Sequence, residues 1–165
     1  MKIVVIGLGY VGLTLALTLS DVGFKVEGID KDSRKISKLN IGQPTLYEAK
    51  IQTILLNALE SNSITFHENI SKSNDNRIFI VSVGTPIDDL SNPLIGNLEN
   101  AVKEVGQNLR KGDTVIVRST VPVGTTRTVV KKILEDESGL KAASEFSLAS
   151  APERTLQGLA LEELR

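Results

Sequence analysis

A glycine-rich turn near the amino terminus constrains the fold of this chain more than any other feature. The apolar residues 3–6 lead into Gly7-x-Gly9-x-x-Gly12, and an uncharged segment continues to residue 20. Gly7 allows a tight turn after a strand, Gly9 lets the backbone approach a pyrophosphate, and Gly12 lets the next helix pack closely on the strand. The amino end of that helix offers unpaired N–H groups to phosphates. This order predicts a dinucleotide-binding unit of strand, turn and helix.

An acid completes the unit. A second predicted strand, residues 25–29, ends at Asp30, which follows Gly7 by 23 positions. A carboxylate roughly 20 positions beyond the glycine turn typically binds a hydroxyl of the adenosine ribose. Because the same carboxylate repels a 2′-phosphate, the sequence predicts NAD as the cofactor in preference to NADP.

Residues 3–20 also allow a competing interpretation as a signal peptide or membrane helix, because they carry no charge and follow Met1 and Lys2. Three glycines within six positions would weaken such a helix. A small-x-small cleavage site is not obvious, and the strand at residues 25–29 continues the dinucleotide pattern. We therefore expect no membrane partner.

Composition narrows the possible functions. The 165 residues fit one domain, and the formal net charge of −1 gives no basic surface for nucleic acid. The chain has no cysteine and a single histidine, His67, which we expect to face solvent after a strand. We therefore expect no disulfide and no metal site. The lack of cysteine is compatible with a reducing, cytoplasmic location, which we take as the expectation.

Strand and helix patterns alternate to the end of the chain, which predicts an α/β fold. We expect a Rossmann-type doubly wound parallel sheet with helices on both faces, in a single domain over residues 1–165. The further strands are expected at residues 63–66, 77–83, 114–118 and 146–150. The helices are expected from the glycine turn to about residue 21, at 32–39, 46–60 and 98–110, and from about 125 to 137. The chain stops inside what we expect to be a new helix at 159–164.

Three local patterns refine this layout. Asp32 is the expected N-cap of the second helix, and Thr45-x-x-Glu48 predicts a capping box for the third. The polar residues 68–76 predict a solvated connection with a little helix. Residues 88–97, rich in Asp, Asn, Pro and Gly, predict a flexible loop.

Glycine and polar residues collect directly after the predicted strands. Such ends share one edge of a parallel sheet, and ligands bind in the crevice beside that edge. We therefore expect these clusters to converge into one site. The clusters are residues 7–12, Asp30, Gly84-Thr85-Pro86, Ser119-Thr120 and Pro152-Glu153-Arg154.

Two of these residues are candidates for chemistry. Glu153 is the only carboxylate directly after the last predicted strand and suits a general base or a water-orienting group. Alternatively, it is an acid at a helix amino end that the helix dipole stabilises. Thr120 offers a hydroxyl for the same water or for a substrate oxygen. The composition supplies no Ser/His/Asp set and no Cys/His pair, so nucleophilic catalysis within this chain is not expected.

With these residues assembled, the chain resembles the N-terminal NAD-binding domain of the UDP-glucose/GDP-mannose dehydrogenase family. The similarity extends over the whole chain, and the STVPVGT segment followed by Pro-Glu is its most specific part. The matching segments are KIVVIGLGYVGL at residues 2–13, Asp30, Leu46-Tyr47-Glu48, Val83-Gly84-Thr85-Pro86, STVPVGT at residues 119–125, and Pro152-Glu153. The ending from Ala151 to Gly158 is most similar to the branch that oxidises UDP-N-acetylmannosamine or UDP-N-acetylglucosamine. Enzymes acting on UDP-glucose typically carry Phe and a second Glu where this chain has Arg154 and Gln157.

The resemblance implies a four-electron oxidation of a sugar C6 alcohol to a carboxylate with two NAD. It assigns Glu153 and Thr120 to activating or positioning water. The expected cofactor-binding residues are Gly7, Gly9, Tyr10, Val11, Gly12, Asp30, Val83, Gly84, Thr85, Ser119, Thr120 and Glu153.

Family members are much longer than this chain. Their nucleophilic cysteine, a lysine, the helical dimerisation segment and the UDP-sugar domain belong to regions that this chain lacks. We therefore expect the 165-residue chain to bind NAD weakly, to be inactive alone, and to form part of a homodimer in its full-length form. The alternatives are the same domain of a UDP-glucose or GDP-mannose dehydrogenase, or a stand-alone module that binds NAD(H) without chemistry.

Overall fold

The computed structural model describes residues 1–154 and contains a six-stranded sheet with parallel neighbours throughout. The strands are β1 (Lys2–Ile6), β2 (Val26–Ile29), β3 (Ile64–His67), β4 (Arg77–Val81), β5 (Thr114–Val117) and β6 (Ser147–Ser150). The helices are α1 (Tyr10–Asp21), α2 (Ser33–Asn40), α3 (Ile51–Glu60), α4 (Gly96–Asn108) and α5 (Lys131–Ser138), with a π-helical turn η1 (Thr126–Val130) before α5. The helix predicted at residues 159–164 lies outside the described residues.

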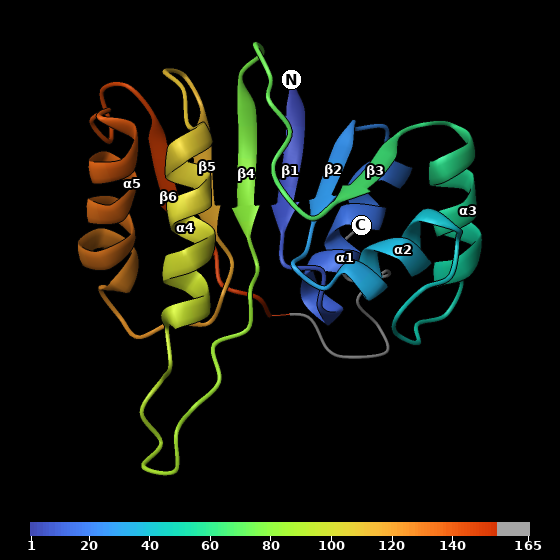
Figure 1. Ribbon diagram of the computed structural model, residues 1–165, viewed down its shortest axis with the longest axis horizontal. Coiled ribbons are helices and arrows are strands. Elements are labelled where there is room, and N and C mark those ends of the chain that lie inside the picture. The colour runs from blue at the N-terminus through green and yellow to red at the C-terminus, as the bar shows by residue number, and fades with distance from the viewer. Residues whose placement is uncertain (155–165) are drawn as a thin grey trace.

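The strand order is β3-β2-β1-β4-β5-β6 (Figure 1). From β1 the chain adds strands outward on one side to β3, then crosses back and adds β4, β5 and β6 on the other side. The direction reverses between β1 and β4, which is the switch point of the doubly wound dinucleotide fold. The predicted fold class is therefore confirmed.

Two apolar cores lie on opposite faces of this sheet. In β1, Ile3 and Val5 belong to one core, whereas Val4 and Ile6 belong to the other. Side chains of α1, α2 and α3 complete the first core, and side chains of α4 and α5 complete the second. The places of these helices beside the sheet can be followed in Figure 1. Because β1 is buried on both faces, its sequence is a continuous apolar run instead of an alternating one.

The strand predicted at residues 77–83 is buried as expected, with Phe79 and Val81 fully covered, but it ends at Val81. The next residue turns toward the glycine loop, because the Ser82 hydroxyl donates a hydrogen bond to the Gly7 carbonyl oxygen over 2.9 Å. Residues 82 and 83 therefore line the site and lie outside the strand.

One of the two predicted helix caps is confirmed and the other is wrong. Asp32 caps α2 by accepting hydrogen bonds from two backbone amides of its first turn. The capping box at Thr45 and Glu48 does not form, since α3 begins only at Ile51. Glu48 is instead buried and accepts a hydrogen bond from the Tyr10 hydroxyl over 2.5 Å. A contact across 38 positions has replaced the local one.

The connection between β3 and β4 contains no helix within the part of the chain that the structure describes, contrary to the small helical content predicted at residues 68–76. Side chains bond its backbone instead: the Ile70 amide donates to Glu104, and the Ser71 amide donates to Glu27. His67 is exposed as predicted, although it is the last residue of β3 and does not follow the strand.

Candidate functional site

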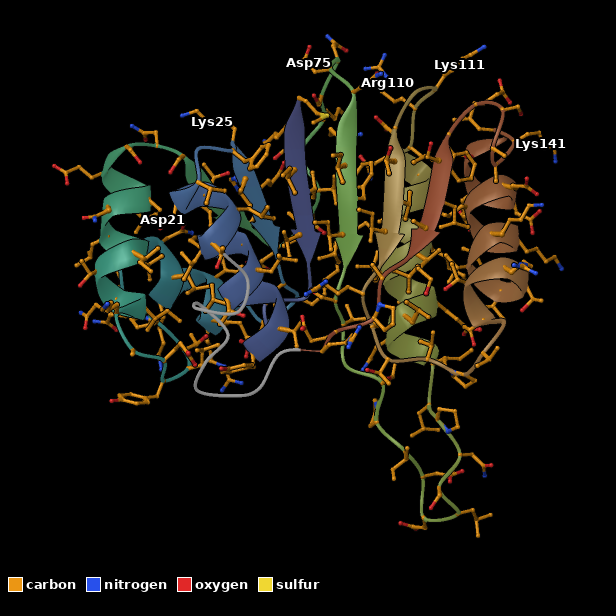
Figure 2. The ribbon with its side chains drawn as sticks, turned by 180° about the vertical axis from the view of Figure 1, so that it is seen from behind. Asp21, Lys25, Asp75, Arg110, Lys111 and Lys141 are labelled. Carbon is orange, nitrogen blue, oxygen red and sulfur yellow. The ribbon has the colours of Figure 1, made fainter. Side chains whose placement is uncertain are left out.

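The strand ends that carry the predicted clusters meet at one edge of the sheet. In Figure 1 the strands point downward, and the glycine turn, the segment after β4 and the end of the described chain lie below them. Figure 2 places Asp75, Arg110 and Lys111 at the opposite edge, beside the amino ends of the strands. The carboxyl edge therefore brings together segments that are distant in sequence.

The amino end of α1 lies at this edge and lacks a capping side chain. Gly9 occupies the N-cap position and has no side chain with which to cap the helix. The helix hydrogen bonds begin with the Leu13 amide, which donates to the Gly9 carbonyl oxygen over 3.0 Å. Uncapped amides and the positive end of the helix dipole together form an anion-binding site.

The glycines of the turn meet different constraints. A Cβ on Gly12 would lie 1.8 Å from the Gly7 carbonyl oxygen, and one on Gly7, whose φ is +89°, would lie 2.9 Å from the Ser82 carbonyl oxygen. A Cβ on Gly9 would meet nothing within 4 Å. Gly7 and Gly12 are thus required by the fold, whereas Gly9 leaves open space above the turn.

Asp30 lies on the β2 side of the turn. Its Oδ2 atom accepts a hydrogen bond from the Leu8 amide over 2.9 Å and lies 2.5 Å from Lys35 Nζ. Its Oδ1 atom accepts from the Asp32 amide over 3.0 Å. These contacts fix the carboxylate beside a cavity of about 350 Å³, whose lining includes Gly7, Asp30 and Lys35. Lys35 was not among the predicted site residues.

A second cavity of about 270 Å³ lies on the other side of the turn. Its lining includes Gly9, Ser82, Val83 and Gly84, which also line the first cavity. The remaining lining residues are Tyr10, Val11, Thr85, Arg118, Ser119, Thr120 and Glu153. The two cavities therefore flank the glycine turn, one toward Asp30 and one toward Glu153.

Hydroxyl groups connect the loops around the second cavity. Thr85 Oγ1 donates to the Thr120 carbonyl oxygen over 2.6 Å, and Ser119 Oγ donates to the Val83 carbonyl oxygen over 2.8 Å. These bonds join the segment after β4 to the segment after β5. Thr85 and Ser119 therefore shape the wall of the cavity through their side chains.

Glu153 faces Arg118 in this cavity. Arg118 Nε and Nη2 lie 2.8 and 2.6 Å from Glu153 Oε2, and the Arg154 amide donates to Oε1 over 2.7 Å. Arg118 was not predicted as a site residue, because a single arginine after a strand gives no local signal of a partner 35 positions away.

All predicted cofactor-binding and catalytic residues except Gly12 line one or both of the two cavities. The other members of the predicted clusters, Leu8, Pro86, Pro152 and Arg154, line neither. Gly12 is buried beneath the two cavities against Gly7 and Ser82. A larger cavity of about 850 Å³ adjoins Ser119 and Thr120 beside β6, and none of the described residues that line it is acidic.

Residues 1–154, which the structure describes, offer neither a metal-binding cluster nor a membrane-spanning helix. Within these residues, no group of three or more His, Cys, Asp or Glu side chains is arranged to hold a metal ion. No helix among them is both long enough and apolar enough to cross a membrane.

The parallel sheet, the switch point beside β1, the uncapped helix above a glycine turn and the acid after β2 together define a dinucleotide-binding domain of the Rossmann type. The family model described as "UDP-glucose/GDP-mannose dehydrogenase family, NAD binding domain" matches residues 1–165. The chain belongs to this family, as its NAD-binding domain, and NAD is its cofactor. The resemblance drawn from the sequence is confirmed.

Similar proteins come from three substrate classes of the family. The UDP-N-acetyl-D-mannosamine dehydrogenase of Pyrococcus horikoshii is 34% identical over 99% of this chain, and its structure superimposes with a TM-score of 0.92. The structure of GDP-mannose dehydrogenase from Pseudomonas aeruginosa is 31% identical over 99% of this chain, with a TM-score of 0.91. The UDP-glucose 6-dehydrogenase of Rickettsia prowazekii is 36% identical over 99% of this chain.

The chain spans only part of each relative. It covers 39% of the length of the Pyrococcus protein, 38% of the Pseudomonas chain and 36% of the Rickettsia protein. The similarity therefore concerns the cofactor domain of these proteins.

Proposed function

We propose that this chain is the NAD-binding part of a UDP-N-acetyl-D-mannosamine or UDP-N-acetylglucosamine 6-dehydrogenase. In the proposed reaction the C6 alcohol of the sugar becomes a carboxylate, water supplies the second oxygen, and two NAD each accept one hydride. The observation that carries the proposal is the pair of cavities flanking the glycine turn, one ending at Asp30 and the other at Thr120 and Glu153.

The residues present fit a dinucleotide in this orientation. The backbone amides at the amino end of α1 would hold the pyrophosphate over the open space beside Gly9. Asp30 would bind the adenosine ribose in the first cavity, with Lys35 holding its carboxylate in place. The nicotinamide end would then occupy the second cavity, where Tyr10, Val11 and Thr85 form the wall.

Thr120 and Glu153 are the proposed catalytic residues of this chain. Both line the second cavity, so a water molecule or a substrate oxygen there would lie within reach of a hydroxyl and a carboxylate. Glu153 already has both oxygens hydrogen-bonded, by Arg118 and by the Arg154 amide. We therefore assign to Glu153 the activation or the orienting of a water molecule in this cavity.

The sugar specificity is proposed from the sequence around Glu153, where Arg154 and Gln157 replace the Phe and the second Glu typical of enzymes that act on UDP-glucose. The Pyrococcus relative is named for UDP-N-acetyl-D-mannosamine, which supports the same choice. The oxidation of UDP-glucose or GDP-mannose is the alternative, and relatives with those names have similar identity. We further propose a cytoplasmic, homodimeric full-length protein.

The test is an assay of the full-length protein against a panel of UDP-sugars and GDP-mannose, with NAD and NADP in parallel. We expect turnover of a UDP-N-acetylhexosamine with NAD, with two NADH formed per sugar. Exclusive turnover of UDP-glucose or GDP-mannose would contradict the proposed specificity. The 165-residue chain alone should bind NAD at millimolar concentration without oxidising any of these sugars.

A further inference from the structure

Helix α4 presents a polar face to the first cavity. Asp30 and Lys31 line this cavity from the segment after β2, and α4 lines it from the other half of the sheet. Residues of α4 that are three, four and seven positions apart lie on one side of the helix. The lining residues of α4 have this spacing and are Asn97, Asn100, Ala101 and Glu104. The first cavity therefore lies between the segment after β2 and one face of α4.

Glu104 is the acid on this face, and two contacts fix its carboxylate. Oε1 accepts a hydrogen bond from the Ile70 amide over 3.0 Å, and Oε2 lies 2.6 Å from Lys31 Nζ. The side chain is only 16% exposed. A carboxylate has about four acceptor sites and, in an ion pair, no hydrogen to donate. Glu104 therefore offers the cavity a hydrogen-bond acceptor and no donor.

This acceptor lies next to the position proposed for the adenosine ribose. Asp30 would bind that ribose, and the residue that Glu104 contacts, Lys31, directly follows Asp30 in the chain. The adenine base joins the ribose through one bond, so it lies within the same cavity. Ala101 lies on the same face as Glu104, and its side chain ends at Cβ, which leaves room for a flat ring beside the acid.

A carboxylate distinguishes adenine from the other common purines. Adenine carries an amino group at C6, which donates hydrogen bonds. Hypoxanthine and guanine carry a carbonyl oxygen at C6, which accepts them. A site that offers only an acceptor to this position attracts the amino group and repels the carbonyl oxygen.

We propose that Glu104 makes this site specific for adenine, by accepting a hydrogen bond from the C6 amino group of NAD. The inference rests on the proposed placement of the adenosine half of NAD in the first cavity. Lys31 and the Ile70 amide hold the carboxylate at the cavity wall, so the acid is already in place before the cofactor binds.

The experiment compares NAD with nicotinamide hypoxanthine dinucleotide, which differs from NAD only in this base. Calorimetry gives the dissociation constants of both for the 165-residue chain. The wild-type chain should bind NAD about tenfold more tightly, because hypoxanthine replaces a donor to a charged group with an acceptor. Glu104→Gln keeps an oxygen for the Ile70 amide and can turn an NH₂ group to the base, so the two affinities should come within about twofold of each other.

Lys31→Gln is the matched control, because it removes the ion pair and leaves the carboxylate in the cavity. Its preference for NAD over the hypoxanthine dinucleotide should stay at or above that of the wild type. Weakening of both dinucleotides by equal factors in Glu104→Gln would assign Glu104 a structural role beside Ile70 and overturn the proposal. If Glu104→Gln does not fold, Glu104→Asp replaces it: the shorter side chain should lower the preference at least about threefold, and an unchanged preference overturns the proposal.

The proposed cofactor placement fails in a different way. If the wild-type chain binds neither dinucleotide at millimolar concentration, the placement and the adenine inference are both overturned. If the wild-type chain binds both dinucleotides equally well, only the adenine inference is overturned.

Discussion

At the scale of single residues, Gly9 and Gly12 offer a matched pair of substitutions within one turn. In Gly12→Ala the new Cβ would lie 1.8 Å from the Gly7 carbonyl oxygen, so α1 must move away from the turn. We expect a loss of about 1–3 kcal/mol in the free energy of unfolding. Gly9→Ala meets no atom within 4 Å and should change that free energy by less than about 0.5 kcal/mol.

Both substitutions should nevertheless weaken NAD binding. The methyl group introduced by Gly9→Ala would enter the space above the turn that the pyrophosphate needs. Denaturant unfolding and calorimetry with NAD distinguish the two effects. Equal destabilisation by both substitutions would show that Gly9 is required for folding and would remove its assignment to the cofactor.

Asp30 provides a second prediction at this scale. Asp30→Asn keeps an acceptor for the Leu8 amide and removes the negative charge, which leaves Lys35 without its ion-pair partner. We expect NADP to bind at least about tenfold better relative to NAD, since the repulsion of the 2′-phosphate is replaced by attraction to the lysine. Competition of NADP against NADH fluorescence measures the change. An unchanged NADP/NAD ratio would show that this carboxylate does not contact the ribose.

At the scale of the elements, Glu27 joins β2 to the crossover between β3 and β4. Its buried carboxylate accepts a hydrogen bond from the Ser71 amide over 2.8 Å and lies 2.8 Å from Lys2 Nζ. Burial opposes ionisation, but Lys2 and Ser71 outweigh it, so the pKa of Glu27 lies below its ordinary value of 4.5. Its contribution to stability is therefore fully present above about pH 4.5 and is lost as the pH falls through the folded-state pKa.

Glu27→Gln should accordingly lower the free energy of unfolding by about 1–2 kcal/mol at pH 7, because Lys2 loses its charged partner. The difference from the wild type should shrink as the pH falls below 4.5. Denaturant unfolding at a series of pH values provides the measurement, with Glu60→Gln at the exposed end of α3 as the control. A difference that stays constant down to acidic pH would exclude the ion pair as its source.

The elements also show what the sequence could and could not predict. The convergence of Asp30, Thr120 and Glu153 was predictable, because strand ends in a parallel sheet share an edge whatever their spacing in the chain. The Glu48 cap was predicted wrongly, because the pattern that identifies a capping box contains no information about a tyrosine 38 positions earlier. Arg118 was missed for the same reason: its importance comes from Glu153, which only the folded sheet places beside it.

At the scale of the whole molecule, the cofactor should stabilise the fold, because the site is made of both halves of the sheet. Asp30 follows β2 on one side of the switch point, and Glu153 follows β6 on the other. The unfolded chain has no such arrangement, so NAD should bind the folded state alone. At ten times its dissociation constant, NAD should then raise the free energy of unfolding by about 1.4 kcal/mol.

Differential scanning fluorimetry over a series of NAD concentrations measures this shift, and Gly9→Ala provides the control. If that variant retains the wild-type stability without cofactor, it should show a smaller shift at each NAD concentration, because only its affinity is reduced. A shift of equal size in both proteins would place the bound NAD away from the glycine turn. AMP and nicotinamide mononucleotide represent the two halves of NAD, which would occupy the first and the second cavity respectively. A shift that appears with AMP and not with nicotinamide mononucleotide would therefore assign the stabilisation to the cavity beside Asp30.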